Sequence, residues 1–399
     1  MFTLASKNGK MLIITIGRIV VKRFLKVIAG YLRKTDLVLL LLCTISTIYG
    51  IILISSSARV LGAGQYLYIQ ILSLIIGIGL YVVFSLIDID IFADRSRTLT
   101  ILSVVFISTL FIWGVAGDSG NRAWLRFAGF GVQPAEIVKI PFTIVLARQI
   151  VDLREKRGIN APLSILQLVI YFGVMFGLII VSSSDLGSAL VYLVIFAVVL
   201  FVAGVNLAWF LLAGGVVAAM VPIMWNFFLS EGQKDRIKAP YDPSVDISGL
   251  GVRWQANQSE AAISAGGFSG TGLYNGAYTQ SEAVPQQHTD FIFSAAGEEL
   301  GFIGCMIIIL LLLLIIIRCI YVGVKSNNTL GMLVCTGFAA MLIFQTFENI
   351  GMCIGLTPVI GLTLPFFSYG GSSIIALFAS MGIIAGIKMR PKPISFRQK

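Results

Sequence analysis

Long apolar runs recur along this chain of 399 residues, from about residue 37 almost to the C-terminus. Runs of about 20 apolar residues are long enough to cross the hydrocarbon of a bilayer as helices. Barrel strands would instead alternate apolar and polar residues over about 10 positions, and no such alternation occurs. Only 12% of the residues are charged, whereas about 25% are charged in a soluble globular domain. The sequence therefore predicts an all-α polytopic membrane protein.

About ten spans can be placed on these runs, and their boundaries are accurate to within about 2–4 residues. We expect residues 36–390 to form a single transmembrane domain, with a basic N-terminal segment at 1–35 and a basic tail at 391–399. The predicted spans are 36–57, 66–87, 98–116, 134–152, 161–181, 187–204, 207–228, 298–322, 330–352 and 368–388.

The basic residues indicate how the chain is oriented. Lys and Arg gather in the N-terminal segment, the tail and the connections at 88–98, 153–160 and 323–329. With ten spans these all lie on one side, which the positive-inside rule makes cytoplasmic. Both termini are then cytoplasmic, and the connections at 117–133 and 229–297 lie outside. The net charge of +10 is explained by topology and anionic lipid, so it predicts no nucleic-acid partner.

The N-terminal segment 1–35 has basic residues spaced through an apolar stretch. This pattern is typical of a basic amphipathic helix that lies on an anionic leaflet. A plain topogenic tail explains the same residues equally well.

Cysteine and histidine give no sign of a metal or redox site. The five cysteines lie inside apolar runs, no C-x-x-C spacing occurs, and the chain has a single histidine. Buried cysteine usually behaves as a small hydrophobic residue, and the spacing matches no zinc or thioredoxin-like motif.

The outward connection at 229–297 is long for a compact membrane protein, and such loops are usually functional or disordered. It contains Trp254 and Gln255, then five glycines between 266 and 276, and closes on PQQHTDFIF at 285–293. Glycine permits tight turns and close approach of a backbone to a ligand. On glycine content alone, a flexible linker is the simpler interpretation, and the loop lacks the G-K-[ST] ending of a phosphate-binding loop.

Asp290 stands where this loop re-enters the membrane, and two interpretations are open. Asp and Thr often cap helix N-termini, so Asp290 and Thr289 are expected to cap the next helix. Alternatively, a carboxylate at the membrane edge is partly desolvated, which raises its proton affinity and suits a general base. His288 either supports that carboxylate or bonds within the loop. Glu298 and Glu299 are expected at the start of the helix, near its positive dipole end.

Other charged residues lie in or beside the spans. Glu136 and Lys139 are three residues apart on one helix, so they share a face and can pair. Asp185 opens another span, and Glu348 lies deep in the ninth. Ionisable groups at such depth usually face a bundle interior or a water-filled cavity, so a structural ion pair and a transport path are both open. The outward-facing cations Arg122, Arg126 and Arg236 fit an anionic head group or lipid phosphates.

Three stretches of sequence resemble the signatures of the shape, elongation, division and sporulation (SEDS) family, which includes RodA, FtsW and SpoVE. The first is PQQHTDFIFSAAGEELGFIG at 285–304 and the second is ENIGMCIGLTPVIGLTLPFFSYGGSS at 348–373. The third is GNRAW at 120–124, followed by QPAEIVK at 133–139. The resemblance covers nearly the whole chain after residue 35, with a slight leaning towards the RodA type.

Two positions depart from the family pattern. The usual Gln-Pro-Ser-Glu has Ala135 in place of serine, and the usual Pro-Asp-Leu-Gly-Thr reads SDLGS at 184–188. The second change removes a helix-kinking proline. Neither change removes a charged group, so the departures affect the expected local helix geometry more than the expected activity.

The resemblance implies a peptidoglycan glycosyltransferase that polymerises lipid II at the outer face of the bacterial cytoplasmic membrane, inverts the donor linkage and releases undecaprenyl diphosphate. It makes Asp290 the expected general base. Cations near the leaving group, or a divalent ion such as Mg²⁺ or Mn²⁺, would stabilise the developing charge, although no metal ligand set is explicit. The expected substrate-binding residues are Arg122, Lys139, Arg236, Trp254, Gln255 and His288, and the expected charged core is Glu136, Asp185 and Glu348.

The family also implies a partner, a class B penicillin-binding protein, in cell elongation, division or sporulation. The alternative is a lipid II flippase or another transporter, suggested by the charged residues within spans. A transporter is expected to carry its essential groups near the bilayer midplane. A purely scaffolding protein is a third hypothesis.

Overall fold

The structure is a computed structural model that describes residues 30–116, 121–127, 130–228, 230–246 and 248–390. Most of the predicted N-terminal segment and the whole predicted tail 391–399 lie outside these residues. Residues 30–34 are helical and lead into the first long helix.

Within the described residues, ten long helical segments occupy the positions of the ten predicted spans, which confirms the predicted all-α architecture. The third span is divided at Thr109 into two helices, and the short α4 (Ile89–Ala93) precedes it. The long segments are α2 (Leu37–Ser57), α3 (Ala63–Leu86), α5 (Ser96–Ser108) with α6 (Leu110–Trp113), α7 (Pro134–Lys156), α8 (Pro162–Ser183), α9 (Leu186–Val202), α10 (Leu207–Ile223), α14 (Ile292–Lys325), α15 (Thr329–Cys353) and α16 (Gly371–Met389).

Eight of these segments are long and apolar enough to cross a membrane by length and composition alone, within the described residues. The other two fall short for visible reasons. Helix α9 has 17 residues and is only slightly shorter than the eight spans. Helix α7 carries Glu136 and Lys139 in its first turns and several charged residues at its far end.

Sequence sets the helix starts through capping residues. Proline occupies the first position of α7 (Pro134) and of α8 (Pro162), where its missing N–H breaks no helical bond. Asp36 and Asp185 cap α2 and α9 by accepting hydrogen bonds from Leu39 N and Ser188 N. Such caps satisfy backbone donors that a helix start leaves unpaired.

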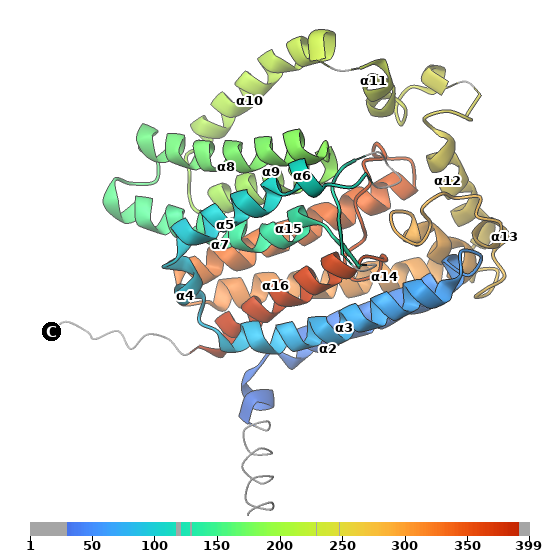
Figure 1. Cartoon of the computed structure of the whole chain (residues 1–399), viewed down its shortest axis with the longest axis horizontal. Helices are drawn as coiled ribbons and strands as arrows, with labels where there is room; N and C mark the ends of the chain where they lie inside the picture. The colour runs from blue at the N-terminus through green and yellow to red at the C-terminus, as the bar shows by residue number, and fades with distance from the viewer. Residues whose placement is uncertain (1–29, 117–120, 128–129, 229, 247, 391–399) are drawn as a thin grey trace, which may run out of the picture.

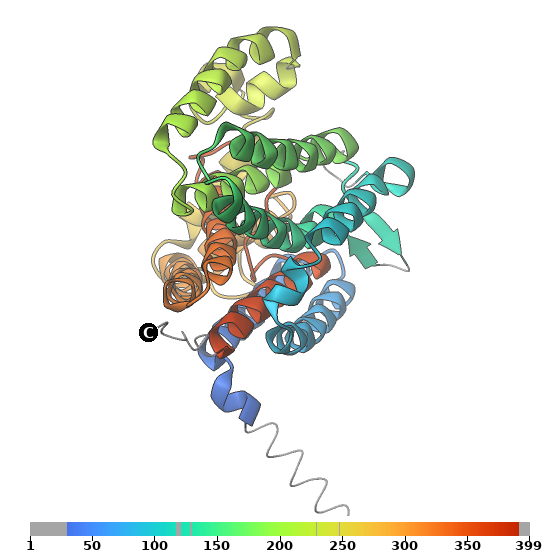
Figure 2. The ribbon, with the colours of Figure 1, turned by 90° about the vertical axis from the view of Figure 1, so that its left-hand side faces the viewer.

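The long helices form a bundle in which neighbours in space are often distant in sequence. Helix α16 packs along α3, and α15 packs between α14 and α9. In contrast, α10 has no buried residue and lies away from the other long helices in both views (Figures 1 and 2). A small antiparallel hairpin of β1 (Leu125–Phe127) and β2 (Phe130–Val132) lies before α7.

Ion pairs gather at one end of the bundle, the end that carries α4 in Figure 1. The fully buried carboxylate of Asp36 lies 2.8 Å from Arg318 Nε and 3.4 Å from Lys388 Nζ. Nearby pairs join Arg390 to Asp88 and Arg148 to Asp94. The elements predicted to be cytoplasmic therefore share one end, while α12 (Trp254–Gly266) and α13 (Ala277–Gln280) lie at the other (Figure 1).

The predicted loop 229–297 is built from short helices and ends earlier than expected. It contains α11 (Glu231–Lys238), η2 (Pro243–Asp246), α12 and α13, and it follows a π-helical turn, η1 (Met224–Phe228). Helix α14 begins at Ile292, six residues before the predicted start at 298, but its backbone breaks at Gly301 (φ +65°, ψ −162°). The helical turns before Gly301 contain Glu298 and Glu299, and the long apolar run follows the break. The flexible-linker interpretation is wrong for the part that packs on α14.

Glycine explains how α12 approaches α14 so closely. A Cβ on Gly266 would collide with the backbone oxygen of Gly297, and a Cβ on Gly270 would collide with that of Glu299. Gly270 also has φ of +82°, a region that side chains disfavour. The glycine run thus allows backbone-to-backbone packing.

Candidate functional site

Asp290 lies two residues before α14, partly buried, and it does not cap the helix. The residue at the cap position is Phe291, and no side chain makes a capping hydrogen bond there. The expectation that Asp290 and Thr289 cap α14 is therefore wrong, because the helix starts one residue too late for the Asp290 side chain. Its carboxylate remains available for another role.

The connection between α15 and α16 holds the backbone around Asp290. Ser368 Oγ donates to the carbonyl of Thr289 at 2.6 Å, and Tyr369 N donates to the carbonyl of His288 at 2.9 Å. Asn349 Nδ2 donates to the carbonyl of Asp290 at 2.7 Å. The two longest sequence signatures, 285–304 and 348–373, therefore form one unit in space.

The same connection runs between Asp290 and the start of α9. An ideal Cβ on Gly361 would lie 3.4 Å from Asp290 Oδ2, and Gly361 has φ of +73°. An ideal Cβ on Gly187, in the first turn of α9, would lie 2.8 Å from the Ile360 carbonyl oxygen. The chain at 360–361 thus passes close to both acidic positions, Asp290 and Asp185.

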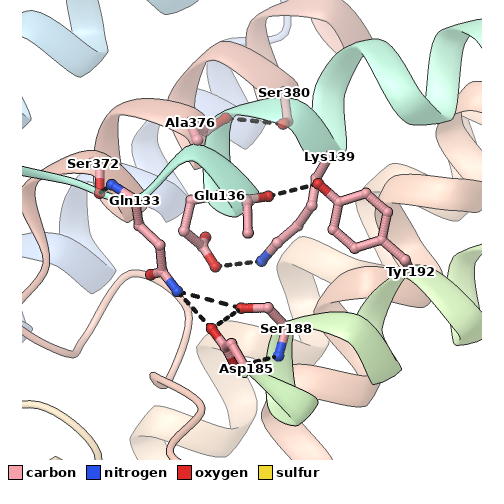
Figure 3. Close-up of polar contacts among 10 residues, drawn as sticks. Gln133, Glu136, Lys139, Asp185, Ser188, Tyr192, Ser372, Ala376 and Ser380 are labelled. Carbon is pink, nitrogen blue, oxygen red and sulfur yellow. Dashed lines mark hydrogen bonds and ion pairs between the residues drawn. The ribbon is translucent and has the colours of Figure 1, made fainter. Parts of the chain in front are cut away.

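A buried polar group forms where α7, α9 and α16 meet (Figure 3). Lys139 Nζ lies 2.5 Å from Glu136 Oε1, and both side chains are almost fully buried. Gln133 Nε2 donates to Asp185 Oδ2 at 2.9 Å, and its backbone N–H donates to Ser372 Oγ at 3.3 Å. The predicted pairing of Glu136 with Lys139 is confirmed, and Asp185 belongs to the same interior group.

Burial and charge set the protonation behaviour of the two aspartates. Burial raises the pKa of Asp290 to about 6, and the negative charge of Asp185 raises that pKa further, while a hydrogen bond from Thr289 opposes the shift. Burial also raises the pKa of Asp185, against the stabilising hydrogen bonds from Ser188. The carboxyl of Asp290 therefore titrates near neutral pH, where a general base works best.

Arg122 lines a cavity of about 300 Å³ at the same end of the bundle. Leu110 and Phe111 of α6 form one wall, and Ser182 and Ser184 at the end of α8 form another. The hydroxyl of Ser182 is buried and has no hydrogen-bond partner among the described residues. Arg122 therefore lines this cavity together with two serines, and arginine is the side chain that most often binds phosphate groups.

His288 is buried in an aromatic cluster. Its ring centroid lies 4.9 Å from that of Tyr66 and 5.8 Å from that of Tyr369. The Tyr66 and Tyr369 rings also meet edge to face. Packing accounts for this position, and direct contact of His288 with substrate stays a prediction.

Among the described residues, no hydrogen bond or ion pair joins the other three predicted binding residues to Asp290. Arg236 is exposed on α11, which lies beyond the end of α10 in Figure 1. Trp254 and Gln255 are partly buried at the start of α12. Their predicted roles therefore remain untested by the fold.

Glu348 lies in the last two turns of α15 rather than deep in the span, because α15 ends at Cys353. Its side chain is 7% exposed, so its burial is confirmed. Glu298 and Glu299 also differ from expectation. They lie in the second and third turns of α14, where Glu298 accepts from Thr279 N at 2.8 Å and Glu299 accepts from Ser56 Oγ at 2.6 Å. These two acids anchor the loop and do not face the helix start.

One departure from the family pattern changes the backbone. Ser184 closes α8 with φ of +55°, a left-handed conformation. Proline is locked near −65° and could not adopt it. The other departure, Ala135, leaves α7 regular, and its carbonyl accepts a 2.7 Å hydrogen bond from Tyr192 Oη.

The described residues contain no group of three or more His, Cys, Asp or Glu that could hold a metal ion. The divalent ion that the resemblance leaves open stays an expectation.

Several residues of the site were missed by sequence reasoning: Gln133, Ser182, Ser188, Asn349 and Ser368. Gln133, Asn349 and Ser368 stand inside the recognised signatures. Neutral polar residues cost less to bury than charged ones and are common in membrane spans, so membership of a signature was the signal that could have singled them out.

Comparisons with known proteins show the family of this chain. The family described as "Cell cycle protein" (FtsW/RodA/SpoVE) matches residues 35–392. The probable peptidoglycan glycosyltransferase FtsW of Trichlorobacter lovleyi is 33% identical over 371 residues, which cover 90% of this chain and 96% of the relative. The peptidoglycan glycosyltransferase MrdB of Escherichia coli K12 is 33% identical over 324 residues, which cover 80% of this chain and 84% of the relative.

Two solved structures are similar over 89% of this chain. One comes from work on the coordination of polymerization and crosslinking by a peptidoglycan synthase complex, with a TM-score of 0.74, 27% identity and 97% of that chain covered. The other is RodA of Thermus thermophilus, with a TM-score of 0.65, 26% identity and 96% of that chain covered.

Proposed function

Because this chain belongs to the FtsW/RodA/SpoVE family, we propose that it polymerises lipid II into glycan strands with Asp290 as the general base. It is a multi-pass protein of the bacterial cytoplasmic membrane and a peptidoglycan glycosyltransferase in cell-wall synthesis. The observation that carries the proposal is the partly buried carboxylate of Asp290, which lies at the outer end of the bundle and does not cap α14.

In the proposed reaction, the Asp290 carboxylate takes the proton of the acceptor sugar hydroxyl. The resulting oxygen attacks the anomeric carbon of the donor, and the bond from that carbon to the diphosphate oxygen breaks. Attack from the face opposite the leaving group turns the α-linkage into a β-linkage. Undecaprenyl diphosphate leaves with the bonding electrons. A pKa of about 6 leaves Asp290 ionised at neutral pH yet basic enough to accept the proton.

The cavity beside Arg122 is the proposed place for a diphosphate group. The Arg122 guanidinium, together with Ser182 and Ser184 of the cavity lining, would stabilise the negative charge that builds up on the leaving group. The ammonium of Lys139 is paired with Glu136, so we propose that Lys139 acts on the substrate only through the electrostatic potential of the site. The family resemblance adds four further residues to the proposed substrate-binding set: Arg236, Trp254, Gln255 and His288.

A class B penicillin-binding protein is the proposed partner, and it would crosslink the strands. A structurally similar chain comes from a peptidoglycan synthase complex, which supports an assembly of this kind. Residues 36–390 are proposed as one transmembrane domain, because ion pairs of Asp36 with Arg318 and Lys388 join α2, α14 and α16.

The test is polymerisation of purified lipid II by the full-length chain with its partner. The wild type should produce glycan strands, and Asp290→Asn should not. Asp242→Asn is the matched control, since Asp242 is an exposed aspartate of the same loop whose partner is Ser244. Equal polymerisation by the Asp290 variant would refute the base assignment.

Transport of lipid II is the competing function. The acidic and basic groups Glu136, Lys139 and Asp185 all lie within the first two turns of α7 or at the cap of α9, whereas transporters place such groups near the midplane. Translocation of labelled lipid II by this chain alone, unchanged in Asp290→Asn, would favour transport over polymerisation.

A further inference from the structure

Two consecutive carbonyl groups just before α14 are held by side chains from the α15–α16 region. Ser368 Oγ donates to Thr289 O at 2.6 Å, and Asn349 Nδ2 donates to Asp290 O at 2.7 Å. Asn349 is 0% exposed and Ser368 is 3% exposed. Water therefore cannot replace either donor easily.

Each of these side chains also fixes the α15–α16 connection. Asn349 Nδ2 donates a second hydrogen bond to Leu362 O at 2.7 Å. Ser368 Oγ accepts one from Leu364 N at 2.8 Å. Both residues thus join the Asp290 backbone to the connection, whose Gly361 lies close to the Asp290 carboxylate.

Asn349 contributes hydrogen-bond donors and no acceptor: its Nδ2 group makes both hydrogen bonds. Its Oδ1 is buried without a hydrogen-bond partner among the described residues, and an unpaired buried polar atom destabilises a fold. An apolar side chain of similar size would avoid that penalty but would release both carbonyls. The two donated hydrogen bonds are what an amide supplies at this position.

We propose that Asn349 and Ser368 are positioning residues that hold the Asp290 carboxylate in its reactive orientation. The inference rests on the proposed function, in which Asp290 is the base. Neither side chain touches the carboxylate, so both act through the Asp290 backbone. A catalytic group must be held to within about 0.5 Å of its productive place, and these hydrogen bonds hold the segment that carries it.

The first experiment separates turnover from substrate binding. Asn349→Leu removes the donor together with the unpaired oxygen, and Ser368→Ala removes one hydroxyl. We expect kcat of each folded variant to fall by about 10-fold to 100-fold, with KM for lipid II nearly unchanged. Thr336→Val on α15, which removes a hydroxyl bonded only within its own helix, is the control and should keep the wild-type kcat.

The second experiment does not depend on polymerisation. A hydrophobic carbodiimide reacts with protonated carboxyl groups, and mass spectrometry measures its addition to Asp290 as a function of pH. In the wild type the labelling midpoint should follow the pKa of Asp290, about 6. In Asn349→Leu and Ser368→Ala it should move to lower pH, because a released carboxylate gains water.

The outcomes distinguish the two proposals. If Asp290→Asn polymerises lipid II while the labelling midpoint still moves in the Asn349 and Ser368 variants, the base assignment fails, and the two residues still hold the Asp290 carboxylate but not for this reaction. Folded variants with wild-type kcat and an unmoved midpoint would overturn the positioning role. Should Asn349→Leu not fold, Ser368→Ala decides the question, since it deletes a single atom from a buried loop.

Discussion

At the scale of single residues, the environment of Asp290 predicts how activity depends on pH. Burial first and the charge of Asp185 second raise its pKa from 3.8 to about 6. A base must be ionised, so the initial polymerisation rate should fall about tenfold per pH unit below that value and level off above it. Rates measured between pH 5 and 8 check this. A profile that stays flat down to pH 5 would contradict it.

The Glu136–Lys139 pair makes a second prediction at this scale. Both side chains are buried at 2.5 Å separation, and removal of one partner leaves an unpaired buried charge that costs about 3–5 kcal/mol. Lys139→Met should therefore destabilise the purified protein strongly in thermal unfolding. The double variant Lys139→Met with Glu136→Gln should regain much of that loss. No gain in the double variant would show that the pair does not act as a unit.

Charged residues were the easiest part of the site to predict from sequence. Charge is rare within apolar runs, so Glu136, Lys139 and Asp185 drew attention, and all three lie in one buried group. The capping interpretation of Asp290 failed because a cap depends on the helix start, which one residue of error changes. Neutral donors such as Asn349 have no comparable signal and needed the structure.

At the scale of elements, close packing of α12 on α14 depends on Gly266. A Cβ there would collide with the Gly297 backbone oxygen, so Gly266→Ala should push the two helices apart. We expect a lower thermal unfolding temperature and faster proteolysis within the loop. Gly232→Ala is the control, because nothing lies within 4 Å of its Cβ position. Equal protease resistance of the Gly266 variant and the wild type would be inconsistent with this packing.

Sequence located the long helices well and the outer loop poorly. Apolar runs of about 20 residues are a strong signal, and each predicted span became a helix. The loop helices α11, α12 and α13 are short and polar, and α12 depends on tertiary contact with α14. Such elements have little periodicity to read, because packing stabilises them more than local preference does.

At the scale of the whole molecule, Asp36 joins three helices that are distant in sequence. It accepts from Arg318 at 2.8 Å and lies 3.4 Å from Lys388. Asp36→Asn keeps a good capping residue on α2 but loses the charge, so we expect a loss of about 1.5–3 kcal/mol. Chemical unfolding in detergent measures it. Asp88→Asn, which breaks a more exposed pair with Arg390, should cost at most about 1 kcal/mol.

If Asp36→Asn proved no less stable than Asp88→Asn, the ion pairs of Asp36 with Arg318 and Lys388 would not join the helices as described. The orientation of the chain was predictable because basic residues can be counted in the sequence, and the positive-inside rule assigns the side on which they gather to the cytoplasm.

The leaning towards a RodA-type role stays a prediction, since the FtsW and MrdB relatives are equally similar to this chain at 33% identity.

In the proposed reaction, the Asp290 carboxylate, two residues before α14, removes the acceptor's proton. The most direct test of this step is the initial rate of lipid II polymerisation at pH 8, with wild type and Asp290→Asn in parallel and lipid II binding measured on both. Because the pKa of Asp290 is raised in the fold, the neutral variant should be at least as stable as the wild type above pH 6. We expect the variant to fold, to bind lipid II and to make no glycan strands. Strands formed at the wild-type rate would contradict it.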